Sequence, residues 1–111
     1  MTHGFHPDAA QDFDDQVRYY QGRGRLLGER FAAEVCFAIR RILETPERWR
    51  VIEDDVRRCR VRVFPFSVLY TIESDFILIL AVMHDKRQPG YWKDRLGFPR
   101  DEAPRQAGSS R

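Results

Sequence analysis

The chain has 111 residues, of which 42% are hydrophobic and 32% are charged. This length suits one domain with a modest core. The longest apolar run, residues 76–83, is far shorter than the roughly 20 residues needed to span a bilayer. The N-terminus lacks the basic and apolar regions of a signal peptide, so we expect a cytoplasmic protein that does not enter a membrane.

The charge is spread unevenly, although its net value is only +2. Residues 1–22 carry four aspartates and one arginine, whereas residues 57–62 carry four arginines and no acid. So small a net charge does not make a polycation that coats nucleic acid. The local basic patch instead suits an acidic partner segment or a few phosphates.

Two helices are predicted in the first half of the chain. The first spans residues 7–20, because proline and aspartate at its start favour a first turn. The second spans residues 26–44 and ends before Pro46. A break at residues 22–24 joins them into an antiparallel hairpin. Their apolar stripes are Ala9, Phe13, Val17 and Tyr20 in the first helix, and Leu27, Phe31, Val35, Ala38, Ile39 and Ile42 in the second.

The hydrophobic period then changes from 3.6 to 2, which predicts strands. In residues 58–63 three arginines alternate with cysteine and valine, giving one cationic face and one apolar face. Residues 66–72 alternate again, and a turn at residues 74–75 follows. Residues 76–83 are apolar throughout and suit a central strand covered on both faces. A stretch near Phe5 is too short to predict as a further strand.

These elements predict an α+β fold, in which the N-terminal helix hairpin packs on a small antiparallel sheet followed by a short C-terminal helix or turn. Residues 1–96 form the single domain. Residues 97–111 are rich in proline, glycine, serine and charge, and we expect a disordered tail. Cys36 and Cys59 form no CxxC pair and are too few for a disulfide framework, so both are predicted to be buried thiols.

The arginine strand is the first candidate binding site. Arg58, Arg60 and Arg62 would project from one face about 7 Å apart, which is twice the rise per strand residue. That spacing is close to the phosphate spacing of a nucleic-acid strand, and it equally suits the carboxylates of an acidic peptide. The alternative is a solvated face that keeps the protein soluble.

The segment after the last strand, HDKRQPGYWKDR, is the second candidate site. In a ribonuclease, His84 would protonate a leaving oxygen while cations stabilise the phosphate; a structural histidine is the alternative. Tyr91 and Trp92 would either anchor the segment on the sheet or stack on a base. We expect no metal or cofactor, because the three histidines show no paired spacing and no phosphate-binding loop is present.

The order of elements and four short stretches resemble the ParE/RelE superfamily, toxins of bacterial type II toxin–antitoxin systems. FHPDAAQDFDD at residues 5–15 is similar to the opening helix of that family, and ETP at residues 44–46 to its helix stop. VRVFPFSVLYTIE at residues 61–73 resembles its arginine and F-P core. Residues 79–84, followed by K-R-x-P-x-Y-W, resemble its closing strand and ending. The resemblance covers about residues 5–96.

The resemblance implies a toxin that forms a hetero-oligomer with a cognate antitoxin. ParE-like members bind DNA gyrase and are not nucleases, whereas RelE-like members cut mRNA on the ribosome without a metal. The ending H-D-K-R-Q-P-G-Y-W is more similar to ParE, and arginines stand where RelE-like enzymes usually show lysines. Gyrase inhibition is therefore the first hypothesis. A ribosome-dependent mRNA endonuclease and an inactive relic that still binds antitoxin are the alternatives.

These hypotheses assign roles to particular residues. The residues expected to bind the antitoxin or phosphates are Arg58, Arg60, Arg62, Lys86 and Arg87. The residues expected to contact the target are Tyr91, Trp92 and Arg95. His84 and Tyr91 are catalytic only if the protein is a ribonuclease. An acidic or amphipathic antitoxin segment is expected to cover the arginine face and the exposed groove of the helix hairpin.

Overall fold

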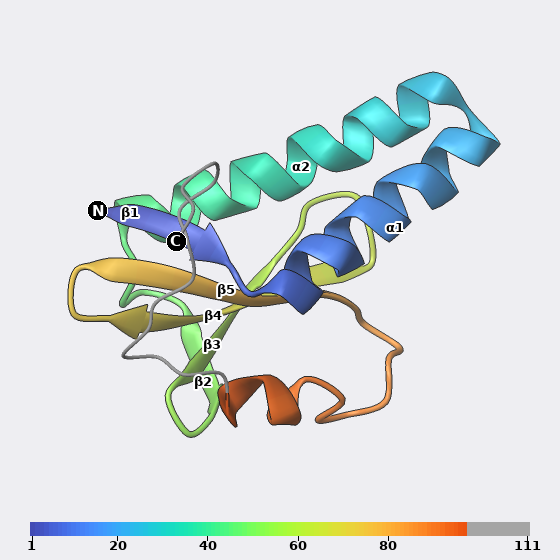
Figure 1. Cartoon of the computed structure of the whole chain (residues 1–111). Coiled ribbons are helices and arrows are strands. Elements are labelled where there is room, and N and C mark those ends of the chain that lie inside the picture. Colours follow the sequence, from blue (N-terminus) through green and yellow to red (C-terminus); the bar gives the residue numbers. More distant parts are fainter. Residues whose placement is uncertain (98–111) are drawn as a thin grey trace.

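The computed structural model describes residues 1–97, so the predicted tail, apart from Gly97, lies outside the described residues. The elements in chain order are β1 Thr2–Phe5, α1 Pro7–Arg23, α2 Arg25–Glu44, β2 Arg50–Glu53, β3 Val56–Arg60, β4 Phe66–Glu73, β5 Phe76–His84 and the 3₁₀ helix η1 Lys93–Gly97. The helix hairpin covers one face of the sheet, and η1 lies on the other side (Figure 1). The predicted α+β architecture is confirmed.

The helix hairpin forms as its apolar stripes predict, with differences at its ends. α1 extends three residues beyond the prediction, so only Gly24 separates the two helices. His6 caps the start of α1, because its Nδ1 accepts a hydrogen bond from Asp8 N at 3.0 Å. Near the connection the helices approach closely: a Cβ on Gly28 would lie 3.0 Å from the backbone nitrogen of Gln21.

The sheet has five strands in the order β1-β5-β4-β3-β2 and is mixed (Figure 1). β3, β4 and β5 form the predicted antiparallel meander. β1 pairs with β5 in parallel, and β2 pairs with β3 at the opposite edge. Both edge strands have only four residues, and every residue of β2 is exposed. Neither strand therefore carries the alternation from which a strand is predicted.

The strand β3 ends at Arg60, three residues earlier than predicted. Val63 has a φ of 76°, which a β-branched residue rarely adopts and which does not fit an extended strand. Arg62 therefore lies in the loop before β4, not in a row with Arg58 and Arg60. This corrects the predicted face of three arginines.

Each face of the sheet carries its own buried cluster. The helix-side cluster includes Phe31 and Ile42 of α2. The cluster on the opposite face includes Leu78 of β5 and Trp92 of the C-terminal segment. Residues 76–83 are all buried, as their uninterrupted apolar run predicts, because β5 has cover on both faces.

Two residues of the second helix are more exposed than predicted. Cys36 is exposed, whereas Cys59 of β3 is buried in the helix-side cluster, where burial raises the pKa of its thiol. Leu27 is 38% exposed, because it lies in the first turn of α2 at the tip of the hairpin. The predicted pair of buried thiols is therefore correct only for Cys59.

A β-bulge in β5 changes which side chains face the helices. Leu69 pairs with Ala81, and Tyr70 pairs with Ile79, so Leu80 has no partner in β4. Leu80 and Ala81 both belong to the cluster opposite the helices. The bulge begins where β1 has ended, so the outer edge of β5 is open to side chains at this point.

Candidate functional site

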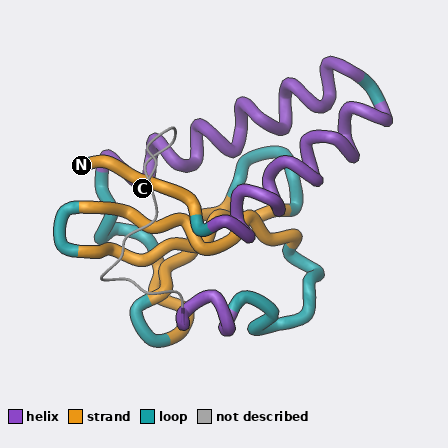
Figure 2. Tube along the Cα trace, viewed as in Figure 1, coloured by secondary structure: helices purple, strands orange, loops and turns teal. Residues whose placement is uncertain are grey.

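The closing segment, residues 85–97, leads from the end of β5 to the sheet face opposite the helices (Figure 2). Trp92 is 3% exposed and packs in the cluster on that face, which is the anchoring position considered for it. Lys93 forms an ion pair with Glu53 of β2 at 2.7 Å. The segment is thus held by a buried aromatic side chain and by an exposed ion pair.

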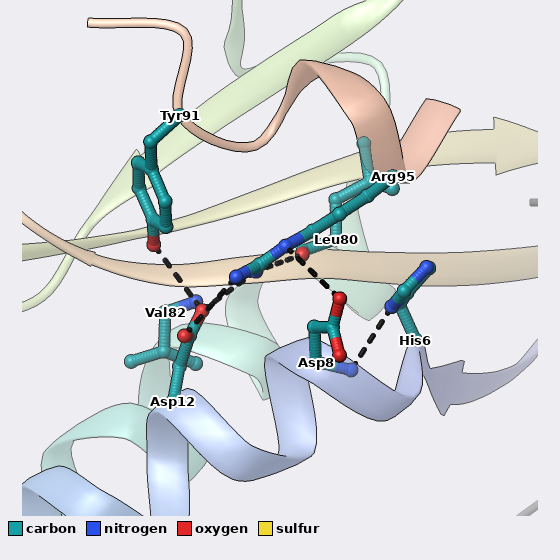
Figure 3. Close-up of polar contacts among 7 residues, drawn as sticks. All are labelled: His6, Asp8, Asp12, Leu80, Val82, Tyr91 and Arg95. Atoms are coloured by element: carbon teal, nitrogen blue, oxygen red, sulfur yellow. Dashed lines mark hydrogen bonds and ion pairs between the residues drawn. The ribbon is translucent and has the colours of Figure 1, made fainter. Parts of the chain in front are cut away.

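Asp12 of α1 fastens the closing segment to the helix hairpin (Figure 3). Its carboxylate accepts hydrogen bonds from Arg95 Nη1 at 2.8 Å, Tyr91 OH at 3.2 Å and Val82 N at 3.2 Å. Arg95 Nη1 also donates to Leu80 O at 2.9 Å. The Asp12 and Arg95 side chains therefore satisfy backbone groups of β5 beyond the end of β1. We call Asp12, Tyr91 and Arg95 the clasp.

The clasp keeps the phenol of Tyr91 neutral. Burial and the charge of the Asp12 carboxylate raise the pKa of Tyr91 to about 12. The hydroxyl is already bound to that carboxylate, so proton transfer from Tyr91 to a substrate would first have to break the clasp. This environment suits an anchoring side chain better than a general acid.

Arg58 and Arg60 lie on the sheet face opposite the helices and share one carboxylate. Arg58 Nη2 is 3.1 Å from Asp85 Oδ1, and Arg60 Nη2 is 3.0 Å from Asp85 Oδ2. Ser67 Oγ accepts a hydrogen bond from Arg58 Nε at 2.9 Å and donates one to Asp85 at 3.1 Å. Two guanidiniums and one carboxylate leave one net positive charge, so this arginine pair still attracts an anion.

Among the described residues, the other predicted cations do not share the Asp85 carboxylate with the arginine pair. The Arg62 guanidinium lies 5.4 Å from the Phe37 ring centroid of α2. The Arg87 guanidinium stacks on the Tyr91 ring at 4.0 Å. Lys86 is exposed in the turn after β5. The predicted surface of five cations is therefore one pair and three separate side chains.

His84 lies on the helix side of the sheet. Its ring packs edge-on against Phe66 of the helix-side cluster, with a centroid distance of 4.9 Å. Its Nδ1 accepts a hydrogen bond from Lys86 N at 3.0 Å. Ser67, the next residue of β4, faces the other way and binds Arg58. His84 and the arginine pair therefore lie on opposite faces and share no site.

A groove of about 680 Å³ opens along the helix hairpin, between β1, α1 and the second half of α2. Most of its lining is apolar, and Asp14 and Arg40 add one charge of each sign. Its main apolar residues are Phe5, Pro7, Ala10, Phe13, Ile39 and Leu43. This is the hairpin groove in which an antitoxin segment was expected.

Two further properties of residues 1–97 bear on the classes of function. No helix in this range has the length and apolar character needed to cross a bilayer. In the same range, no three side chains of histidine, cysteine, aspartate or glutamate come together as possible metal ligands.

The fold and its surfaces define a small α+β domain with a clasped C-terminal segment, an apolar groove and a cationic sheet face. Residues 4–89 match the family model of the ParE toxin of the type II toxin–antitoxin system parDE. The chain therefore belongs to the ParE toxin family, as its motifs predict.

The fold is also similar to a solved structure described as the chromosomal ParDE TA system from P. aeruginosa. The TM-score is 0.68 and the sequence identity is 17%, over 76% of this chain and 95% of that chain. At this identity the likeness concerns the fold alone. A comparison with curated proteins gives no match.

Two acidic side chains of the site were not predicted. Asp85 was noted in the closing segment, but not as the partner of two arginines. Asp12 was counted only in the acidic N-terminal region. A signal was present for Asp12, because it lies between Ala9 and Phe13 on the apolar stripe of α1, where an unpaired carboxylate is unfavourable. The sequence did not indicate that its partner would be Arg95.

Proposed function

We propose that this protein is the toxin of a toxin–antitoxin pair and that it inhibits DNA gyrase by binding it. One observation supports binding over RNA cleavage: the groups that a ribonuclease would use lie apart from one another. His84 packs on the helix side, Tyr91 is bound to Asp12, and the arginine pair lies on the other face around Asp85. Membership in the ParE family favours gyrase as the partner.

In this proposal the closing segment contacts the target as a folded unit. Trp92 is buried and the Arg95 side chain is only 10% exposed, so both act by holding the segment in shape. The exposed cations Lys86 and Arg87 are available for direct contact. Opening the clasp should therefore weaken inhibition, although no clasp residue itself touches the target.

The cognate antitoxin is proposed to occupy the hairpin groove with apolar side chains and to place acidic residues near the arginine pair. Ala10→Arg tests the groove, because Ala10 is exposed and a long side chain there would fill the groove without entering the core. We expect antitoxin affinity to fall at least tenfold, or by roughly 1.4 kcal/mol. Gln16→Arg, which adds the same side chain on α1 outside the groove lining, is the matched control. Equal affinities for the two variants would place the antitoxin elsewhere.

Induced expression in a bacterial host without antitoxin tests the mode of action. DNA synthesis and protein synthesis are followed separately by pulse labelling. We expect DNA synthesis to stop first, with filamentous cells, and His84→Ala to be equally toxic. If protein synthesis stops first, mRNA is cleaved and His84→Ala abolishes both effects, the protein is a ribonuclease and not a gyrase inhibitor. Normal growth with folded protein present would identify a relic.

A further inference from the structure

The cationic surface of the arginine pair extends to the edge of the sheet, away from the hairpin groove. It is a cavity of about 620 Å³ between the end of α2, the following loop and strands β2 and β3. Its lining consists of five arginines, one tryptophan and one isoleucine, namely Arg41, Arg48, Trp49, Arg50, Ile52, Arg58 and Arg60. No acidic residue of the described part of the chain lines it. We call it the arginine cavity.

Three arginines of this cavity are not neutralised. Asp85 pairs with Arg58 and Arg60, but Arg41, Arg48 and Arg50 form no ion pair with any residue of the described part. The positive charge of the cavity is therefore larger than that of the arginine pair alone. A concave site of one charge attracts the opposite charge more strongly than a flat surface does.

Two buried donors in the cavity also need an acceptor. Arg41 Nη1 and Trp49 Nε1 are both buried, and neither has a hydrogen-bond partner among the described residues. The guanidinium of Arg41 lies 4.8 Å from the indole ring centroid, which keeps the two donors close together. A donor pair of this kind is satisfied by an anionic oxygen group, and leaving it unsatisfied is unfavourable.

The surroundings favour a peptide carboxylate over a nucleic-acid phosphate. The indole ring of Trp49 is contacted by the guanidiniums of Arg41 and Arg48 at 4.8 and 5.1 Å, which hinders stacking of a base on it. Ile52 adds an apolar wall, and it is 37% exposed. A site that binds both a carboxylate and an apolar side chain suits a polypeptide.

The edge strand gives a second reason for a peptide. Within residues 1–97, β2 is the outermost strand of the sheet and pairs only with β3. Arg50 and Ile52 of β2 both line the cavity, and the register of β2 against β3 shifts between Val51 and Glu53. An extended segment that paired with the free edge of β2 would bring every second side chain to the cavity.

We propose that the arginine cavity binds an extended acidic polypeptide segment, which pairs with β2 and places a carboxylate against Arg41 and Trp49. The segment alternates acidic and apolar side chains, so that carboxylates meet the arginines and an apolar side chain meets Ile52. Arg58 and Arg60 line this cavity and are also the arginines proposed to meet acidic residues of the antitoxin, so this inference rests on that part of the proposed function. It does not depend on gyrase as the target.

The indole N–H signals of the full-length protein in a ¹H–¹⁵N spectrum test this proposal. The probe is a synthetic peptide of alternating glutamate and valine, and a lysine–valine peptide is its control. The Trp49 signal should shift saturably with the acidic peptide, and the shift should weaken with salt. Trp92, buried on the other side of the sheet, is the internal control and should not move.

Variants then locate the binding. Arg41→Gln should lower peptide affinity about tenfold or more, as expected for a lost charge-assisted hydrogen bond. Arg50→Gln changes an exposed side chain and should lower affinity with little effect on folding. Arg18→Gln, in an exposed ion pair on α1, should leave affinity unchanged. Three results would overturn the proposal: no shift of Trp49, an equal effect of all three variants, or tighter binding of a short oligothymidylate than of the acidic peptide.

Discussion

Replacement of Asp12 is the most informative test of the clasp. Its carboxylate accepts hydrogen bonds from two side chains and one backbone nitrogen, and it pairs with Arg95, whose side chain is 10% exposed. Removing one partner of a buried pair typically costs about 3–5 kcal/mol, because the other charge is left buried. Arg95 keeps its hydrogen bond to Leu80 O, so we take the lower end, about 3 kcal/mol, for Asp12→Ala.

Urea unfolding and thermal scans measure this loss. For a domain of this size, about 3 kcal/mol corresponds to a Tm decrease on the order of 10–20 °C. Asp14→Ala on the same helix is the matched control, because Asp14 pairs with Arg18 and both side chains are more than half exposed. An exposed pair of this kind contributes at most about 1 kcal/mol.

A double variant separates the pair from its surroundings. Asp12→Leu with Arg95→Met removes both charges, and much of the stability lost in Asp12→Ala should return. If Asp12→Ala is no more destabilising than Asp14→Ala, the buried pair does not hold the closing segment, and the clasp account is wrong.

Three further predictions concern pH and backbone strain. Burial lowers the pKa of His6. The contribution of the neutral His6 side chain to stability is therefore complete above pH 6.5 and decreases as the pH falls towards the pKa of the folded state. His6→Asn should remove this decrease when the free energy of unfolding in urea is measured over that pH range. Burial raises the pKa of Tyr91 to about 12, so stability is complete below pH 10 and is lost as the pH rises through about 12, and Tyr91→Phe should flatten that loss in alkaline thermal scans. Val63 is 68% exposed and has a φ of 76°. Val63→Gly should therefore raise the free energy of unfolding in urea by about 1 kcal/mol, because glycine adopts this backbone conformation without strain. An unchanged or lower urea midpoint would show that the loop is not strained.

The parts of the fold that were predicted correctly depend on local patterns. Burial is visible in the sequence as the apolar run of residues 76–83 and as the apolar stripes of the two helices. These three elements and most of their buried positions could therefore be predicted from the spacing of apolar residues. The strand β2 was not predicted because all four of its residues are exposed. The length of β3 was overestimated because alternation continues through Arg62, whereas the backbone turns at Val63.

The site was harder to predict because it depends on contacts between distant residues. The clasp joins Asp12 to Arg95 across 83 positions, and the shared carboxylate lies 27 positions after Arg58. Spacing along one element says nothing about such pairs. The arginine strand was recognised as cationic, but its partial neutralisation by Asp85 depends on where the chain leaves β5. The role proposed for Trp49 likewise depends on a cavity that forms only when three elements meet.

We propose that this ParE family member acts by binding gyrase and does not cut RNA. The most direct measurement is the supercoiling activity of purified gyrase with increasing amounts of the purified protein. We predict inhibition that antitoxin reverses, that Asp12→Ala weakens at a temperature where this variant remains folded, and that His84→Ala leaves unchanged. Unaffected supercoiling, together with cleavage of ribosome-bound mRNA by the same preparation, would contradict the claim.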